Sequence, residues 1–214
     1  MIKTNSFRLG VFVCALGLTA CGGPIVPELV PLPGNEDNAP ELLDSSTVVM
    51  ETSAGRIRME IYPEAAPNAA ARFIELVEAG FYDETPIFRI VPGFVAQFGV
   101  NWRDDHRSQQ NNNFQDDRGF FALSRGTLAF AKTQQPNSAS TQIFINYGDN
   151  SQLAAQNFQA FGIVYEEDME VVDSFVQVGD ASMGLDQGRL WSDGGTYLQS
   201  LETKPTMIES ARLD

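Results

Sequence analysis

Residues 87–99 read Ile-Phe-Arg-Ile-Val-Pro-Gly-Phe-Val-Ala-Gln-Phe-Gly, and this stretch constrains the fold more than any other part of the chain. Pro92 and Gly93 divide it into two apolar strands, because this dipeptide marks a turn or bulge. Arg89 is its only cation, and Gln97 is its only side-chain amide. A guanidinium among apolar neighbours is costly unless its donors are satisfied. Period-2 alternation would instead direct Arg89 to solvent, and the stretch alone leaves both orientations open.

The residues before this stretch predict two strands and a helix. Residues 47–52 and 56–62 have strand-forming composition, and the Ser-Ala-Gly between them suits a hairpin turn. Pro67 opens a helical segment that runs to about Ala79 with one apolar face, and Gly80 closes it.

The residues after it predict further strands and a second helix. The Ile-Phe-Ile at residues 143–145 indicates a strand, and a helix with several candidate buried positions is expected over about 167–175. Residues 204–210 predict a closing strand. No internal repeat is visible, so we expect one mainly β domain over residues 47–214.

Three ordered blocks of this domain resemble the cyclophilin family of peptidyl-prolyl cis-trans isomerases. The family pattern of the first block is Phe-His-Arg, two apolar residues, Pro-Gly-Phe, two residues and Gln-Gly. This sequence matches it at Arg89, Pro92, Gly93, Phe94 and Gln97. The second and third blocks are matched by residues 126–132, 136–138, 141–146, 149–153 and 158–164. The resemblance covers roughly residues 47–211 and implies a closed eight-stranded antiparallel barrel capped by two helices.

The same resemblance implies an isomerase that uses no cofactor and no metal. Amide resonance alone opposes rotation about an X-Pro bond, so a catalyst needs only to favour the twisted state. By resemblance, the catalytic residues are Arg89, which donates an N–H to the prolyl nitrogen, and Gln97, which orients Arg89 and binds the substrate backbone. The residues assigned to substrate binding in the same way are Phe94, Val95, Lys132, Thr133, Gln142, Phe144, Leu153 and Phe158.

Several departures from the family pattern keep an alternative open. Phe88 and Phe158 stand where the family often has histidine, and Ile143 replaces an aromatic residue. Gln152 falls where many eukaryotic members carry tryptophan, which puts cyclosporin binding in doubt. The alternative is a catalytically weak module that binds proline-containing peptides as a chaperone. A purely structural envelope lipoprotein would not need a cation, an amide and an aromatic cup together.

Residues 1–20 have the composition of a secretory signal, with Lys3 and Arg8 before a short apolar run. The Leu-Thr-Ala-Cys that ends at Cys21 resembles a bacterial lipobox, which implies cleavage before Cys21 and its lipidation; an ordinary signal peptide is the alternative. The residue after Cys21 is Gly22 rather than aspartate, which by resemblance to Gram-negative lipoproteins implies sorting to the outer membrane. We therefore expect a lipid-anchored envelope protein, on the outer membrane facing the periplasm, that acts on proline-containing exported polypeptides.

Composition also indicates how the N-terminal part is organised and whether disulfides form. Residues 21–46 are rich in proline without an apolar period, which predicts an extended tether between anchor and domain. Cys14 lies in the signal and Cys21 would carry lipid, so we expect no disulfide.

Without the signal the formal charge falls from −14 to −16, which argues against nucleic acid as a partner. His106 is the only histidine, which excludes multi-histidine metal sites. No oligomerisation surface is evident, so we expect a monomer.

Overall fold

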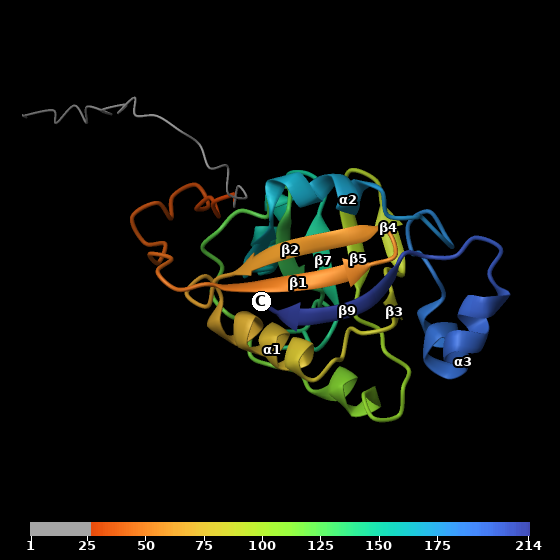
Figure 1. Cartoon of the computed structure of the whole chain (residues 1–214). Coiled ribbons are helices and arrows are strands. Elements are labelled where there is room, and N and C mark those ends of the chain that lie inside the picture. Colours follow the sequence, from red (N-terminus) through yellow and green to blue (C-terminus); the bar gives the residue numbers. More distant parts are fainter. Residues whose placement is uncertain (1–26) are drawn as a thin grey trace, which may run out of the picture.

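The computed structural model describes residues 27–214, and its strands form a single curled antiparallel sheet (Figure 1). The predicted signal and lipidated Cys21 lie outside the described residues. The strands are β1 (Ser46–Thr52), β2 (Gly55–Ile61), β3 (Thr85–Pro86), β4 (Arg89–Val91), β5 (Val95–Phe98), β6 (Thr127–Phe130), β7 (Ile143–Asn146), β8 (Gly162–Val164) and β9 (Met207–Leu213). The α-helices are α1 (Pro67–Glu78), α2 (Met169–Asp173) and α3 (Gln187–Ser200), and the 3-10 helices are η1 (Arg107–Asn111), η2 (Ser151–Gln156) and η3 (Glu166–Asp168).

The strand order is β3-β9-β1-β2-β8-β6-β7-β5-β4, so β3 and β4 lie at the two ends of the sheet. These end strands are successive parts of one segment, separated only by Ile87 and Phe88. Its first part pairs with β9, and its second part pairs with β5. The predicted mainly β antiparallel class is confirmed. Nine strands are found instead of the predicted eight, because one segment divides at Ile87 and Phe88 into β3 and β4. The predicted closure of the barrel is not confirmed, since no ladder joins β3 to β4 among residues 27–214.

The first hairpin and first helix form for the reasons that their sequences suggested. β1 and β2 align Met50 with Ile57 and Val48 with Met59, and all four side chains are buried on the inner face of the sheet. Helix α1 begins at Pro67, as predicted, and its apolar face lies against this core. Burial of such an apolar face is what stabilises a helix of this length.

Two other predictions need correction, and one helix was missed. The second helix is shorter than expected, because its first turn is the 3-10 helix η3 and only α2 is α-helical. The closing strand begins at Met207 rather than residue 204, since Pro205 has no N–H to donate to a ladder. Helix α3 was not predicted. Its sequence contains three glycines, which are poor helix formers.

Part of the predicted tether lies on the domain. The Leu32 N–H donates to the Phe120 carbonyl (2.8 Å), and the Ala122 N–H donates to the Val30 carbonyl (2.7 Å). Leu29 is buried in an apolar cluster with Val95 of β5 and Phe144 of β7, which is separate from the main core. Residues 29–32 therefore form an added antiparallel bridge rather than a free spacer.

Candidate active site

The β4–β5 hairpin brings the two polar residues of the central stretch together. Its register pairs Arg89 with Gln97, and Arg89 Nη1 donates to Gln97 Oε1 at 2.9 Å. The turn between the strands is closed by the Phe94 N–H, which donates to the Val91 carbonyl at 2.9 Å. Gly93 has φ +72°, a conformation that residues with a Cβ rarely adopt. Arg89 is thus held by its cross-strand neighbour instead of extending freely into solvent.

A pocket of about 230 Å³ opens beside this pair. Aromatic and aliphatic side chains form most of its wall, and Phe144 packs edge-on against Phe158 with ring centres 5.7 Å apart. The Arg89 guanidinium lies 5.9 Å from the centre of the Phe94 ring. Its partial burial lowers the pKa of Arg89 from the ordinary value. The residues that line the pocket are Arg89, Phe94, Val95, Gln97, Ala131, Lys132, Phe144, Leu153, Gln156 and Phe158.

Eight of the ten residues expected to form the site line this pocket. The other two lie next to it: Gln142 accepts a hydrogen bond from Gln97 Nε2 (2.7 Å), and Thr133 lines an adjoining hollow with Lys132 and Phe158. Ala131 and Gln156 also line the pocket, although the sequence did not single them out.

Arg89 has a second partner that the sequence analysis missed. Its Nε donates to the carbonyl of Ser182, at 2.6 Å, from the loop that precedes α3. With Nη1 bound to Gln97, the guanidinium is fixed on two sides. Nη2 has no hydrogen-bond partner among residues 27–214, so it can donate to a bound molecule. A fixed cation with an uncommitted N–H beside an apolar pocket suits an uncharged group that gains electron density during reaction.

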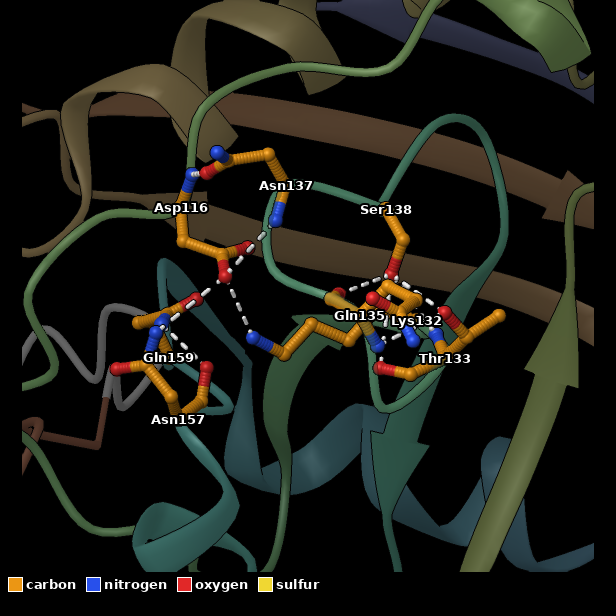
Figure 2. A network of polar contacts seen from close by, with 8 residues as sticks. All are labelled: Asp116, Lys132, Thr133, Gln135, Asn137, Ser138, Asn157 and Gln159. Atoms are coloured by element: carbon orange, nitrogen blue, oxygen red, sulfur yellow. Dashed lines mark hydrogen bonds and ion pairs between the residues drawn. The ribbon is translucent and has the colours of Figure 1, made fainter.

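One wall of the pocket is held by a buried ion pair (Figure 2). Lys132 Nζ lies 2.8 Å from Asp116 Oδ2, with the two side chains only 6% and 11% exposed. The same carboxylate oxygen accepts from the Asn137 N–H and from Asn157 Nδ2. The Lys132 ammonium also lies 5.7 Å from the centre of the Phe158 ring. The charge of Lys132 is therefore neutralised at the rim, and Asp116 ties together two loops that flank the pocket.

The loop after Lys132 is ordered by its own side chains. Ser138 Oγ accepts from the N–H and hydroxyl of Thr133 and donates to the Gln135 carbonyl (Figure 2). On the other flank, Gln159 Nε2 donates to the Asn157 carbonyl. These bonds give both loops a defined backbone at the edge of the pocket.

Two further features are absent from residues 27–214. This part of the chain has no group of three or more His, Cys, Asp or Glu residues placed to hold a metal ion. It also has no helix with the length and apolar character needed to cross a membrane.

Comparison with known proteins agrees with this geometry. Residues 47–188 match the family model described as cyclophilin type peptidyl-prolyl cis-trans isomerase/CLD. The chain belongs to this family. A peptidyl-prolyl cis-trans isomerase A from Dickeya dadantii is 32% identical over 176 residues, which cover 79% of this chain and 85% of the relative. A peptidyl-prolyl cis-trans isomerase from Acinetobacter baylyi is 35% identical over 152 residues, covering 68% and 79% respectively.

Solved cyclophilins share the fold. A Cryptosporidium parvum cyclophilin type peptidyl-prolyl cis-trans isomerase superposes with a TM-score of 0.59 at 19% identity, covering 80% of this chain and 98% of that one. A second structure of that protein, in the presence of the dipeptide Ala-Pro, gives a TM-score of 0.58. Family and relatives together identify this cyclophilin as a peptidyl-prolyl cis-trans isomerase.

Proposed function

We propose that this cyclophilin accelerates the folding of exported proteins in the cell envelope, and that Arg89 is its catalytic residue. The observation that carries the mechanism is the position of Arg89, which lines the same 230 Å³ pocket as Phe94 and Phe144. An apolar cup of this kind suits the proline ring, and the guanidinium at its edge suits the nitrogen of that ring.

The proposed chemistry needs no covalent intermediate. The X-Pro amide has a rotation barrier of about 20 kcal/mol because resonance gives its C–N bond partial double character. In the twisted state this resonance is lost and the prolyl nitrogen regains its lone pair. An N–H of Arg89 that donates to this nitrogen binds the twisted state more strongly than either planar state, which raises the rate. Gln97 and the Ser182 carbonyl hold the guanidinium in place beforehand.

The site of action is inferred from the N-terminal sequence. A signal over residues 1–20 and a lipidated Cys21 would place the domain in the envelope, on the outer membrane facing the periplasm. Uncatalysed prolyl isomerisation takes about 10–100 s at 25 °C, so it delays the folding of newly exported chains. The proposed substrates are proline-containing exported polypeptides, and the protein is proposed to act as a monomer.

The mechanism can be tested on residues 22–214 produced without the signal. An Ala-Pro peptide serves as substrate, and Arg89→Ala is compared with Arg56→Ala, which removes an exposed arginine from β2. We expect Arg89→Ala to lower kcat/KM at least tenfold, which is about 1.4 kcal/mol of transition-state stabilisation, and Arg56→Ala to leave it unchanged. Activity that is indifferent to Arg89 would overturn the mechanism. A folded wild type no faster than buffer would favour the peptide-binding module.

The envelope location needs a separate test. We expect the full chain to incorporate labelled palmitate in Gram-negative cells and to fractionate with outer membranes. Cys21→Ala should abolish the label. Equal labelling of both proteins, or wild type found in the soluble fraction, would contradict the proposed anchor.

A further inference from the structure

The loop before α3 packs directly onto the strand that carries Arg89. The Leu185 N–H donates to the Phe88 carbonyl at 2.8 Å. Gly184 has φ +72°, and a Cβ there would lie 2.6 Å from the Arg89 Cα and closer still to the Phe88 carbonyl oxygen. Only glycine allows this approach, so the loop and β4 form one packed unit.

This loop presents the Ser182 carbonyl to Arg89 from a tight hairpin. Asp180 and Gly184 exchange two backbone hydrogen bonds of 2.8 Å each. The Asp180 carboxylate accepts from the backbone N–H groups of Ser182 (2.8 Å) and Met183 (2.9 Å). The carbonyl that binds Arg89 Nε is therefore fixed by local bonds.

A second connection reaches Arg89 through three side-chain amides. Gln187 Oε1 accepts from Gln142 Nε2 at 3.0 Å, and Gln142 Oε1 accepts from Gln97 Nε2 at 2.7 Å. Gln97 Oε1 then accepts from Arg89 Nη1 at 2.9 Å. Gln97 and Gln142 each accept at the amide oxygen and donate at the amide nitrogen, and Gln187 ends the chain as an acceptor, so the orientation of each amide depends on the next.

Gln187, which ends this amide chain, is held by the packing of α3. It is the first residue of that helix, and the preceding Asp186 caps it by accepting from the Arg189 N–H at 3.0 Å. Leu190 and Tyr197 of α3 are buried in one apolar cluster with Phe88. The end of the amide chain is thus attached to the same cluster as the strand of Arg89.

We propose that Gln187 is a positioning residue for Arg89, which sets the polarity of the amide chain so that Gln97 offers oxygen to the guanidinium. The proposal rests on the proposed catalytic role of Arg89. Arginine has five N–H donors and no acceptor, so only an oxygen at Gln97 can hold it. A donor at position 187 reverses the preferred orientation of Gln142 and then of Gln97. An amide nitrogen then faces Arg89 Nη1, which loses its bond, and the guanidinium is held by the Ser182 carbonyl alone and becomes more mobile.

The test compares an acceptor and a donor at position 187. Gln187→Glu keeps an acceptor for Gln142 Nε2, whereas Gln187→Lys places a donor there. Gln199→Lys makes the same change on an exposed face of α3, away from the amide chain. We expect Gln187→Lys to lower kcat about tenfold with KM for an Ala-Pro peptide unchanged. Gln187→Glu should retain most of the wild-type kcat. Gln199→Lys should have the same kcat and KM as wild type.

A second measurement does not depend on turnover. Nitrogen-15 NMR of the Arg89 Nε–H reports whether that proton is protected from solvent exchange, as its bond to Ser182 requires. We expect protection in wild type and Gln187→Glu, and faster exchange in Gln187→Lys. Wild-type rate and protection in Gln187→Lys, or equal losses in Gln187→Lys and Gln187→Glu, would overturn the inference. A normal rate in Arg89→Ala would overturn the proposed mechanism instead, and the NMR result would still decide the positioning role.

Discussion

At the scale of single residues, the ion pair of Lys132 and Asp116 is the charge interaction most shielded from water beside the pocket. A buried charge that loses its partner is strongly destabilising, by about 3–5 kcal/mol. We expect Asp116→Ala to lower the free energy of unfolding by about 3 kcal/mol, and Lys132→Met in the same background to recover part of that loss. Urea unfolding of residues 22–214 measures both changes.

The matched control is Asp193→Ala, which also removes an aspartate from an ion pair, with Arg189. Both of those side chains are about half exposed, so water screens the interaction. The control should leave the urea midpoint unchanged. Equal effects of Asp116→Ala and Asp193→Ala would mean that burial does not distinguish the two pairs.

The sequence predicted the residues at the centre of the site better than the residues that hold them in place. Arg89, Phe94 and Gln97 belong to one short hairpin, so local spacing alone brings them together. Asp116 and Gln187 reach the site from irregular or weakly helical segments, distant in sequence from the side chains they bind. Such segments have no periodicity, so the sequence does not indicate which way their side chains point.

At the scale of secondary structure, α3 depends on tertiary packing more than on its own propensity. Gly194 interrupts the helix with φ +51°, and a Cβ there would lie 2.6 Å from Trp102 Cγ. The adjacent Gly195 has no atom within 4 Å of its Cβ position. The two glycines therefore differ in the space around them while sharing one helix.

This difference makes a paired test of α3. Gly194→Ala should lower the stability of α3 by about 2 kcal/mol or more, because positive φ costs about 1–2 kcal/mol before any clash. Gly195→Ala should be neutral or slightly stabilising, since alanine favours helix. Amide hydrogen exchange of residues 187–200, with Trp102 fluorescence, resolves the two outcomes. A harmless Gly194→Ala would mean that α3 does not pack tightly on Trp102.

The other elements show why α3 was missed. Helix α1 combines a proline at its start with a regular apolar face, and β1 and β2 flank a turn sequence, so each could be predicted from local sequence. In α3 the signals conflict. Buried Leu190 and Tyr197 favour a helix, whereas its glycines oppose one. Contacts with Phe88 and Val100, far away in sequence, stabilise the helix.

At the scale of the whole molecule, the segment before β1 contributes to the apolar cluster that borders the pocket beside Arg89. Leu29 belongs to the same buried cluster as Val95 and Phe144, both of which line that pocket. The sequence could not indicate this, because a proline-rich segment with scattered apolar residues has no period from which a buried face is inferred. Part of the predicted linker thus packs against the apolar cluster that borders the pocket.

The last prediction tests the packing of this segment with two neighbouring residues. Leu29 is 4% exposed, whereas Val30 is 56% exposed. Leu29→Ala should lower the free energy of unfolding by about 2–4 kcal/mol, because a buried leucine loses its contacts and leaves a cavity. Val30→Ala, on the solvent side of the same bridge, should change it by less than about 0.5 kcal/mol.

Because Leu29 shares a cluster with Phe144, Leu29→Ala should also raise KM for an Ala-Pro peptide while Val30→Ala leaves it unchanged. Urea unfolding and steady-state kinetics on residues 22–214 provide the two readouts. If both variants behave like wild type, residues 29–32 are a spacer after all, and the domain reaches as far from its proposed anchor as the full linker allows. If only Leu29→Ala is impaired, the packed part of the domain begins near Leu29, eight residues after Cys21 in the sequence, and fewer residues separate it from the proposed membrane anchor.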